Sequence, residues 1–84
     1  MMEMKAVESS QILRVGFDPE RGVCRVEFKS RKIPGDISAI WEYGDEQHPI
    51  TQMDFDLWMR SPSIGGFFGK HIKGVYNAAC IEKR

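Results

Sequence analysis

The chain has 84 residues, of which 42% are hydrophobic, 11% aromatic and 29% charged. This length supports one domain with a modest core, and the composition is typical of a soluble globular protein. No uncharged apolar run approaches the roughly 20 residues that span a bilayer, so we expect no membrane segment. Residues 1–8 form a polar leader without the apolar region of a secretory signal. We therefore expect a cytoplasmic protein with a single domain over residues 9–84.

The formal net charge is zero, but the charges are unevenly distributed along the chain. Residues 1–32 carry a net charge of +2, residues 33–59 carry −6 without any Lys or Arg, and residues 60–84 carry +4. An acidic middle between two basic ends argues against a uniformly basic surface for tight, non-specific nucleic-acid binding. A local basic patch remains compatible with this distribution.

The two cysteines, Cys24 and Cys80, have no CxxC spacing, and both His48 and His71 lie far from them in sequence. This arrangement does not match a zinc site, so we expect no metal and no cofactor. Free thiols are the favoured state, with a disulfide as the lesser alternative in a reducing compartment.

Period-two alternation of apolar residues predicts three antiparallel strands, at residues 12–17, 24–28 and 37–43. Turn residues 18–22, which include Pro19 and Gly22, join the first two strands into a hairpin. Residues 29–36 form a long polar link to the third strand. We expect one face of the hairpin to be buried, and it comprises Leu13, Val15, Phe17, Cys24, Val26 and Phe28.

Two helices are predicted in the aromatic-rich second half of the chain. Thr51 and Asp54 form a capping box, and the helix they open must end near Arg60, because residues before a proline avoid helical geometry. Ser63 is a plausible N-cap for a second helix. The apolar stripe of the first helix is Phe55, Trp58 and Met59, and that of the second is Phe67, Phe68, Ile72, Val75 and Tyr76.

These elements predict the α+β class, as a three-stranded antiparallel meander followed by two short helices. Residues 78–81 are compatible with a short C-terminal edge strand.

Catalytic residue types are present without a catalytic arrangement. Ser61, Ser63 and the two cysteines are possible nucleophiles, and the two histidines are possible bases, but none lies in a motif such as GxSxG. We therefore expect no enzyme. The segment 63–66 opens a helix with two glycines and offers backbone N–H groups to an anion, but close helix packing is the favoured role of those glycines.

Basic and aromatic residues in the second half make nucleic-acid binding a hypothesis. Lys70, His71 and Lys73 lie on one helical stretch, and Trp41 and Tyr43 lie on one strand. Aromatic side chains stack on bases when they are exposed, although most aromatics in so small a domain are needed for the core.

The spacing of these residues resembles the KTSC domain, a small domain found at the C-terminus of certain lysyl-tRNA synthetases and also as a stand-alone protein. The hairpin matches through Ser9-Ser10-x-Ile12, Val15-Gly16-Phe17-Asp18 and Val26-x-Phe28, and Trp41-Glu42-Tyr43 matches the central Tyr-x-Tyr strand with Trp in place of the first Tyr. The helical half matches at Phe55, Trp58, Ser61, Ser63, Gly65, Phe67, Phe68, Ile72, Lys73 and Tyr76. The resemblance implies an α+β fold and, through the synthetase fusion, an association with RNA.

Our leading hypothesis is a non-catalytic binding module for RNA. The candidate ligand-binding residues are Trp41, Tyr43, Ser63, Lys70 and Lys73. The alternative is a protein-interaction or self-association domain, with the acidic region 33–59 facing a basic partner. Convergence of the candidate residues on one exposed surface favours a site, whereas their dispersal or burial favours a scaffold.

Overall fold

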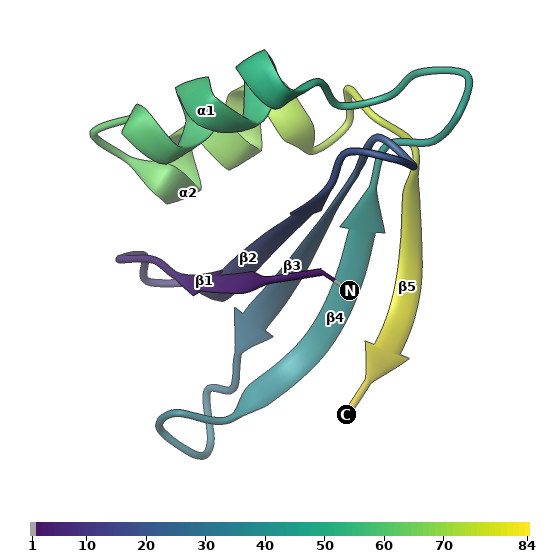
Figure 1. The fold of residues 1–84 in the computed structure, drawn as a ribbon. Helices are drawn as coiled ribbons and strands as arrows, with labels where there is room; N and C mark the ends of the chain where they lie inside the picture. The colour runs from purple at the N-terminus through teal and green to yellow at the C-terminus, as the bar shows by residue number, and fades with distance from the viewer. Residues whose placement is uncertain (1) are drawn as a thin grey trace.

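The computed structural model describes residues 2–84, which form a five-stranded antiparallel sheet with two helices on one side of it (Figure 1). The strands lie in the spatial order β1-β2-β3-β4-β5. Their bounds are β1 (Met4–Ala6), β2 (Ile12–Asp18), β3 (Val23–Lys29), β4 (Ile37–Tyr43) and β5 (Ala78–Lys83). The helical elements are α1 (Gln52–Arg60), α2 (Ile64–Phe67) and the π-helical turn η1 (Phe68–Ile72). The predicted α+β class and the edge strand after the helices are confirmed.

Strand β1 lies within the segment that the sequence predicts to be a polar leader. Met4 pairs with Gly16 of β2, and a Cβ atom on Gly16 would lie only 2.5 Å from the Met4 sulfur. Glycine at this position therefore leaves room for the methionine side chain. A strand this short has no readable alternation, and it forms because β2 supplies an edge to which it can hydrogen-bond.

A β-bulge in β2 corrects the predicted buried face. Ile12 pairs with Phe28 and Arg14 pairs with Glu27, so Leu13 is the extra residue of the bulge. Ile12 is consequently fully buried, and Leu13 is only half-buried and outside the core cluster. The prediction that Leu13 belongs to the core is wrong because simple alternation does not reveal a bulge.

Helix α1 begins and ends where its sequence predicts. The Thr51 hydroxyl accepts a hydrogen bond from the Asp54 N–H at 3.2 Å, and the Asp54 carboxylate accepts one from the Thr51 N–H at 3.3 Å. This capping box satisfies N–H groups that have no partner inside the helix. Trp58 on the inner side of α1 is fully buried, and its indole N–H donates to the Ile64 carbonyl at 3.0 Å.

The second helical segment changes from an α-helical to a wider π-helical turn at Phe68, and it is shorter than its apolar stripe predicts. It runs from α2 into η1 and stops at Ile72, because Lys73 adopts an extended backbone and Gly74 a φ of 79°. Val75 therefore lies beyond the helix and is 48% exposed, which corrects its predicted place in the core. Phe68 and Ile72 are buried as predicted.

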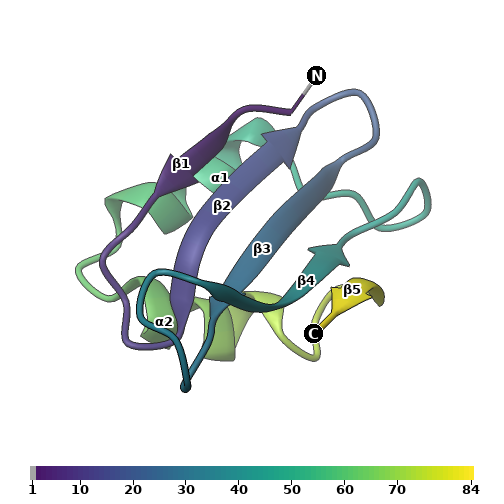
Figure 2. The ribbon, with the colours of Figure 1, turned by 90° about the horizontal axis from the view of Figure 1, so that it is seen from below.

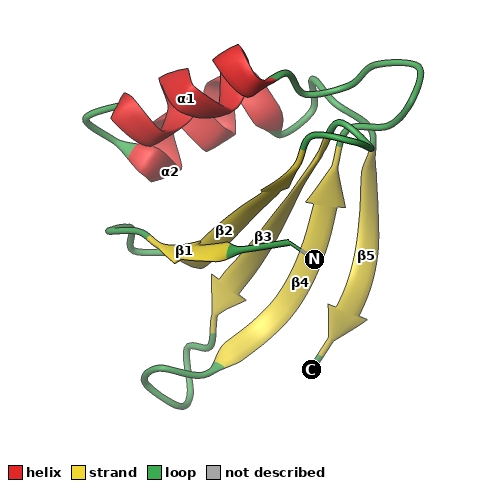
Figure 3. Ribbon diagram, viewed as in Figure 1, coloured by secondary structure: helices red, strands yellow, loops and turns green. Residues whose placement is uncertain are grey.

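The core lies between the helices and the β2–β3–β4 part of the sheet. It is built around Trp58, whose ring stacks on Phe67 at 6.4 Å and on Phe68 at 6.0 Å between centroids. Figures 2 and 3 show that β5 lies at the edge of the sheet away from the helices. All six residues of β5 are exposed. On the side of the sheet that carries the helices, the part near β4 and β5 is therefore left uncovered.

Candidate functional site

A hollow of about 560 Å³ opens beside β4, where the helices cease to cover the sheet. Trp41 and Tyr43 of β4 line it together with Phe28 of β3, and Gly69 of η1 and Lys73 contribute from the helical side. We call this hollow, defined by these five residues, the aromatic groove. Three of the five predicted site residues thus meet at one surface.

The aromatic side of the groove is held in place by packing from beneath. Trp41 lies beside Tyr43 with 6.5 Å between ring centroids and an interplanar angle of 26°. Tyr43 in turn packs edge-on against Phe68 at 5.2 Å and 84°, an arrangement that aromatic rings favour. Phe28 also meets Phe68 edge-on, at 5.7 Å. These contacts fix the orientation of the ring surface that faces the groove.

Trp41 and Tyr43 differ in what they offer a ligand. Tyr43 is only 6% exposed and belongs to the core, and burial, with a smaller contribution from the nearby Cys80, raises the pKa of its hydroxyl. Trp41 is half-buried and packs against the core from outside. Trp41 is therefore the side chain with ring surface left for stacking, and Tyr43 supports it.

Glycines form the helical wall of the groove. Gly65 and Gly69 are one helical turn apart, and both line the hollow. A Cβ atom on Gly69 would meet no atom within 4 Å, so no packing constraint on the protein itself requires a glycine there. The absence of a side chain at Gly69 instead leaves open space on the helical side of the hollow that Trp41 also lines. Gly69 lies in η1, and π-helical turns occur frequently at functional sites.

Lys73 places a positive charge at the end of the groove. It follows η1, its backbone N–H donates to the Phe68 carbonyl at 2.8 Å, and its side chain is exposed. Lys73 takes part in no ion pair within residues 2–84. Lys70 is exposed on the same helical segment but does not line the groove.

The structure places the remaining candidate, Ser63, outside the groove. Its hydroxyl accepts a hydrogen bond from the Gly66 N–H at 3.1 Å and so caps α2. Ser63 lines a smaller polar hollow of about 280 Å³ with Ser9 and Ser10, and this hollow adjoins the groove at Gln11 and Gly65. The role that its contacts show is the capping of a short helix.

Two further residues that line the groove, Phe28 and Gln11, are not among the site residues predicted from the sequence. Phe28 belongs to the face predicted to be buried, but it is only half-buried, because its contact with Phe68 leaves the part of its ring that lines the groove uncovered. Gln11 lies in the turn before β2, where its backbone is fixed by hydrogen bonds to Ser9 and Lys29. No local pattern in the sequence marks either residue, because their positions depend on what the helices leave uncovered.

The opposite side of the sheet carries compensated charges. The Glu42 carboxylate accepts a 2.8 Å hydrogen bond from Arg25 and a longer one, at 3.3 Å, from Arg21. Glu42 is 9% exposed, and although burial by itself raises its pKa, these two guanidinium groups more than offset this and hold the pKa below its usual value. Arg14 and Glu27 form a second pair at 2.5 Å. The arginines of this side are therefore already paired.

No catalytic or metal-binding cluster is found among residues 2–84. His48 stacks on Tyr76 at 4.4 Å and His71 packs on Phe67 at 4.6 Å. No hydrogen bond within the described part of the chain joins either imidazole to a serine or cysteine, and no group of three His, Cys, Asp or Glu side chains forms there. No helix of the described residues is long and apolar enough to cross a membrane.

Comparison with known proteins identifies the fold. No protein-family model and no curated protein matches the chain. Among solved structures, the crystal structure of a KTSC domain protein from Yersinia pestis superposes with a TM-score of 0.79. The match covers 98% of this chain and 100% of that one, at 24% sequence identity. The chain therefore has the fold of that KTSC domain protein, and the resemblance noted in the sequence is confirmed at the level of the fold.

Proposed function

We propose that this KTSC-fold domain is a non-catalytic module that binds single-stranded RNA in the aromatic groove. The observation that carries the proposal is the convergence of Trp41, a glycine wall and Lys73 on one hollow. Single-stranded nucleic acids are bound by exposed aromatic rings that stack on bases together with cations that follow the backbone. The groove combines both features on the side of the sheet that carries the helices, where they leave Trp41 uncovered.

The shape of the groove supports an unpaired base as its occupant. The half-buried ring of Trp41 lines the groove from the sheet, and Gly69, without a side chain, lines it from the helical segment. A base in a duplex presents only its edges, whereas an unpaired base presents the ring face that an aromatic side chain needs. The proposal therefore concerns single strands and loops rather than duplex RNA.

The charge distribution supports the same side of the sheet. Lys73 and Lys70 are exposed and unpaired within residues 2–84, whereas the arginines on the opposite side are bound to Glu42 and Glu27. A phosphate binds most favourably to a cation that does not first have to give up another anionic partner.

We place the protein in the cytoplasm, a proposal supported by the exposed free thiol of Cys80, which suits a reducing compartment.

The test is the binding of fluorescein-labelled single-stranded RNA, measured by anisotropy at two salt concentrations. We expect saturable binding that weakens as salt rises. Trp41→Ala should weaken it by about tenfold to a hundredfold, because stacking on an aromatic ring is worth roughly 1–3 kcal/mol per base. Lys73→Ala should reduce the slope of log affinity against log salt by about 0.7, the value for one lost phosphate contact.

Two matched variants separate the groove from general effects. Leu57→Ala removes an exposed apolar side chain from α1, outside the groove, and Lys5→Ala removes one charge from β1. Both should bind like the unchanged protein. The absence of saturable, salt-dependent binding at low salt, or equal losses in the control variants, would overturn the proposal.

A protein-interaction role is the second candidate, and exposed apolar residues on α1 favour it. Met53 and Leu57 lie one helical turn apart on the outer side of α1, where they are 73% and 53% exposed. Sedimentation over a range of concentrations tests self-association directly. A monomer at all concentrations would rule out self-association through this surface.

A further inference from the structure

The aromatic groove does not end at Trp41, because two further hollows continue it along the chain. A hollow of about 460 Å³ shares Phe28 and Trp41 with the groove and extends to Lys29, Ser30 and Arg31. A third hollow, of about 470 Å³, shares those last three residues with the second. The three hollows therefore adjoin one another through shared lining residues, and together they define a path from Lys73, past Trp41, to the loop between β3 and β4.

The loop at the far end of this path is held in one shape by its own hydrogen bonds. The Ser30 hydroxyl accepts from the backbone N–H groups of Lys32 and Ile33 at 3.1 and 3.2 Å. The Ser30 N–H donates to the Asp36 carbonyl at 2.9 Å, which closes the loop. A loop organised in this way presents its side chains at a fixed place and loses little conformational entropy when it binds a ligand.

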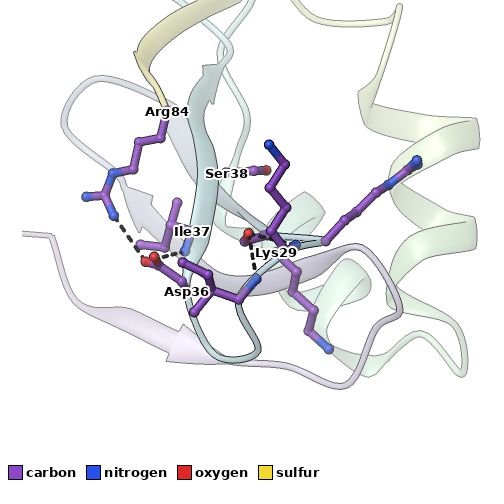
Figure 4. Close-up of a pocket in the computed structure, with 9 residues that line it drawn as sticks. Lys29, Asp36, Ile37, Ser38 and Arg84 are labelled. Carbon is purple, nitrogen blue, oxygen red and sulfur yellow. Dashed lines mark hydrogen bonds and ion pairs between the residues drawn. The ribbon is translucent and has the colours of Figure 1, made fainter.

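The cations that line this end of the path differ in whether they are free to bind. Arg84, which follows β5, is occupied, since it pairs with Asp36 at 3.3 Å (Figure 4). It also pairs with Glu82. Arg31 and Lys32 are exposed and take part in no ion pair within residues 2–84. They are therefore available to an anionic ligand that follows the path.

We infer that the RNA-binding site extends beyond the aromatic groove, and that Arg31 and Lys32 bind the phosphodiester backbone of the nucleotides that follow the one stacked on Trp41. The inference rests on the proposed function and adds a second, backbone-binding segment to the same site. A strand that runs from Lys73 to Arg31 meets unpaired cations at both ends and aromatic rings between them. The site then takes a strand of about four nucleotides, the lower end of the range for small single-strand-binding domains.

Two charge-matched double variants, Arg31→Ala/Lys32→Ala and Lys5→Ala/Arg60→Ala, test this inference against oligouridylates of 2 to 12 nucleotides. Each variant removes two positive charges, but Lys5 and Arg60 lie on β1 and at the end of α1, outside the path. We expect the unchanged protein to bind more tightly as the oligonucleotide lengthens, up to a plateau. The loop variant should reach its plateau at a shorter length and bind the longest oligonucleotide roughly tenfold more weakly at about 0.1 M salt.

The salt dependence provides the second measurement. Loss of two phosphate contacts should lower the slope of log affinity against log salt by about 1.4 for the loop variant and leave it unchanged for the control variant. If the two variants behave alike, the cations act only through net charge, and this inference is wrong while RNA binding stands. If the unchanged protein binds none of the oligonucleotides, both the proposed function and this extension are wrong.

Discussion

Trp41 lies directly opposite Cys80 in the antiparallel pair of β4 and β5. Directly opposite residues share one face of a sheet, so the exposed Cys80 lies beside Trp41 on the face that carries the aromatic groove, although it does not line the groove itself. Cys24, the other free cysteine, is fully buried, and burial, with a smaller contribution from Asp54, raises the pKa of its thiol to about 12. The two thiols should therefore react with a thiol reagent at very different rates, and only the reaction of Cys80 should be sensitive to a ligand in the groove.

Single-stranded RNA should protect Cys80 from modification. In the folded protein we expect one equivalent of a thiol reagent to react quickly, at Cys80, and the second to react only on unfolding. Saturating RNA should slow the fast reaction several-fold, because the bound strand covers the edge of the groove. Mass spectrometry of Cys24→Val, which retains Cys80 alone, checks the assignment. A Cys80 reaction rate that is unaffected by bound RNA would place the strand elsewhere.

Substitution of Gly69 should separate folding from binding. Gly69→Ala places a methyl group where no atom lies within 4 Å, so the unfolding free energy should rise by up to about 1 kcal/mol through better helix propensity. Gly69→Leu fills the space opposite Trp41 and should abolish RNA binding in a protein that melts no earlier than the unchanged one.

Thermal unfolding and anisotropy on the same samples measure the two effects of the Gly69 variants. Gln52→Leu, at an exposed helical position on α1 outside the groove, is the matched control for adding a leucine. Undiminished RNA binding by a well-folded Gly69→Leu protein would contradict the proposed path of the strand.

The buried Cys24 thiol should make stability fall at alkaline pH. Its pKa is higher in the folded protein than the ordinary value of 9.0, so the folded state retains a proton that the unfolded state loses. The stabilisation is complete below pH 9.0 and is lost as pH rises toward about 12. Urea midpoints across this range should therefore decrease, and Cys24→Val should show a shallower decrease. If the urea midpoints of the two proteins fall in parallel as pH rises, the Cys24 thiol does not contribute to the pH dependence of stability.

Glu42 should stabilise the side of the sheet that faces away from the helices. Glu42→Gln removes the charge that Arg25 and Arg21 share, and we expect a loss of about 1–2 kcal/mol, reduced by the exposure of both arginines. Because the folded pKa of Glu42 is lowered, this stabilisation is present above its ordinary pKa of 4.5 and is lost on acidification.

Urea unfolding at neutral and acidic pH measures the contribution of Glu42, and the difference between the two proteins should vanish in acid. RNA binding should be unchanged, since Glu42 lies on the side opposite the groove. A binding defect in the folded Glu42→Gln protein would argue that the strand uses this side.

Local sequence patterns determined most of the secondary structure, because each of these elements is specified by residues that lie close together in the sequence. Thr51 and Asp54 mark the start of α1 by a hydrogen-bonded box that closes within three residues. Alternation likewise marks β3 and β4, since a strand with one buried face must repeat every two residues. The sequence also provided the identity of Trp41 and Lys73 as candidates, through their chemistry alone.

Tertiary structure decided which of these residues line the aromatic groove. The bulge at Leu13, the pairing of β1 and the end of η1 at Ile72 all depend on partners distant in the sequence, and no local pattern encodes them. The two helices cover the end of β4 that holds Tyr43 and leave the part that holds Trp41 uncovered. Tyr43 therefore belongs to the core, whereas Trp41 borders open space, and the hollow forms where the helices no longer cover the sheet. The proposed role of Arg31 and Lys32 likewise depends on the tertiary structure, because adjoining hollows, rather than sequence spacing, connect these cations to Trp41.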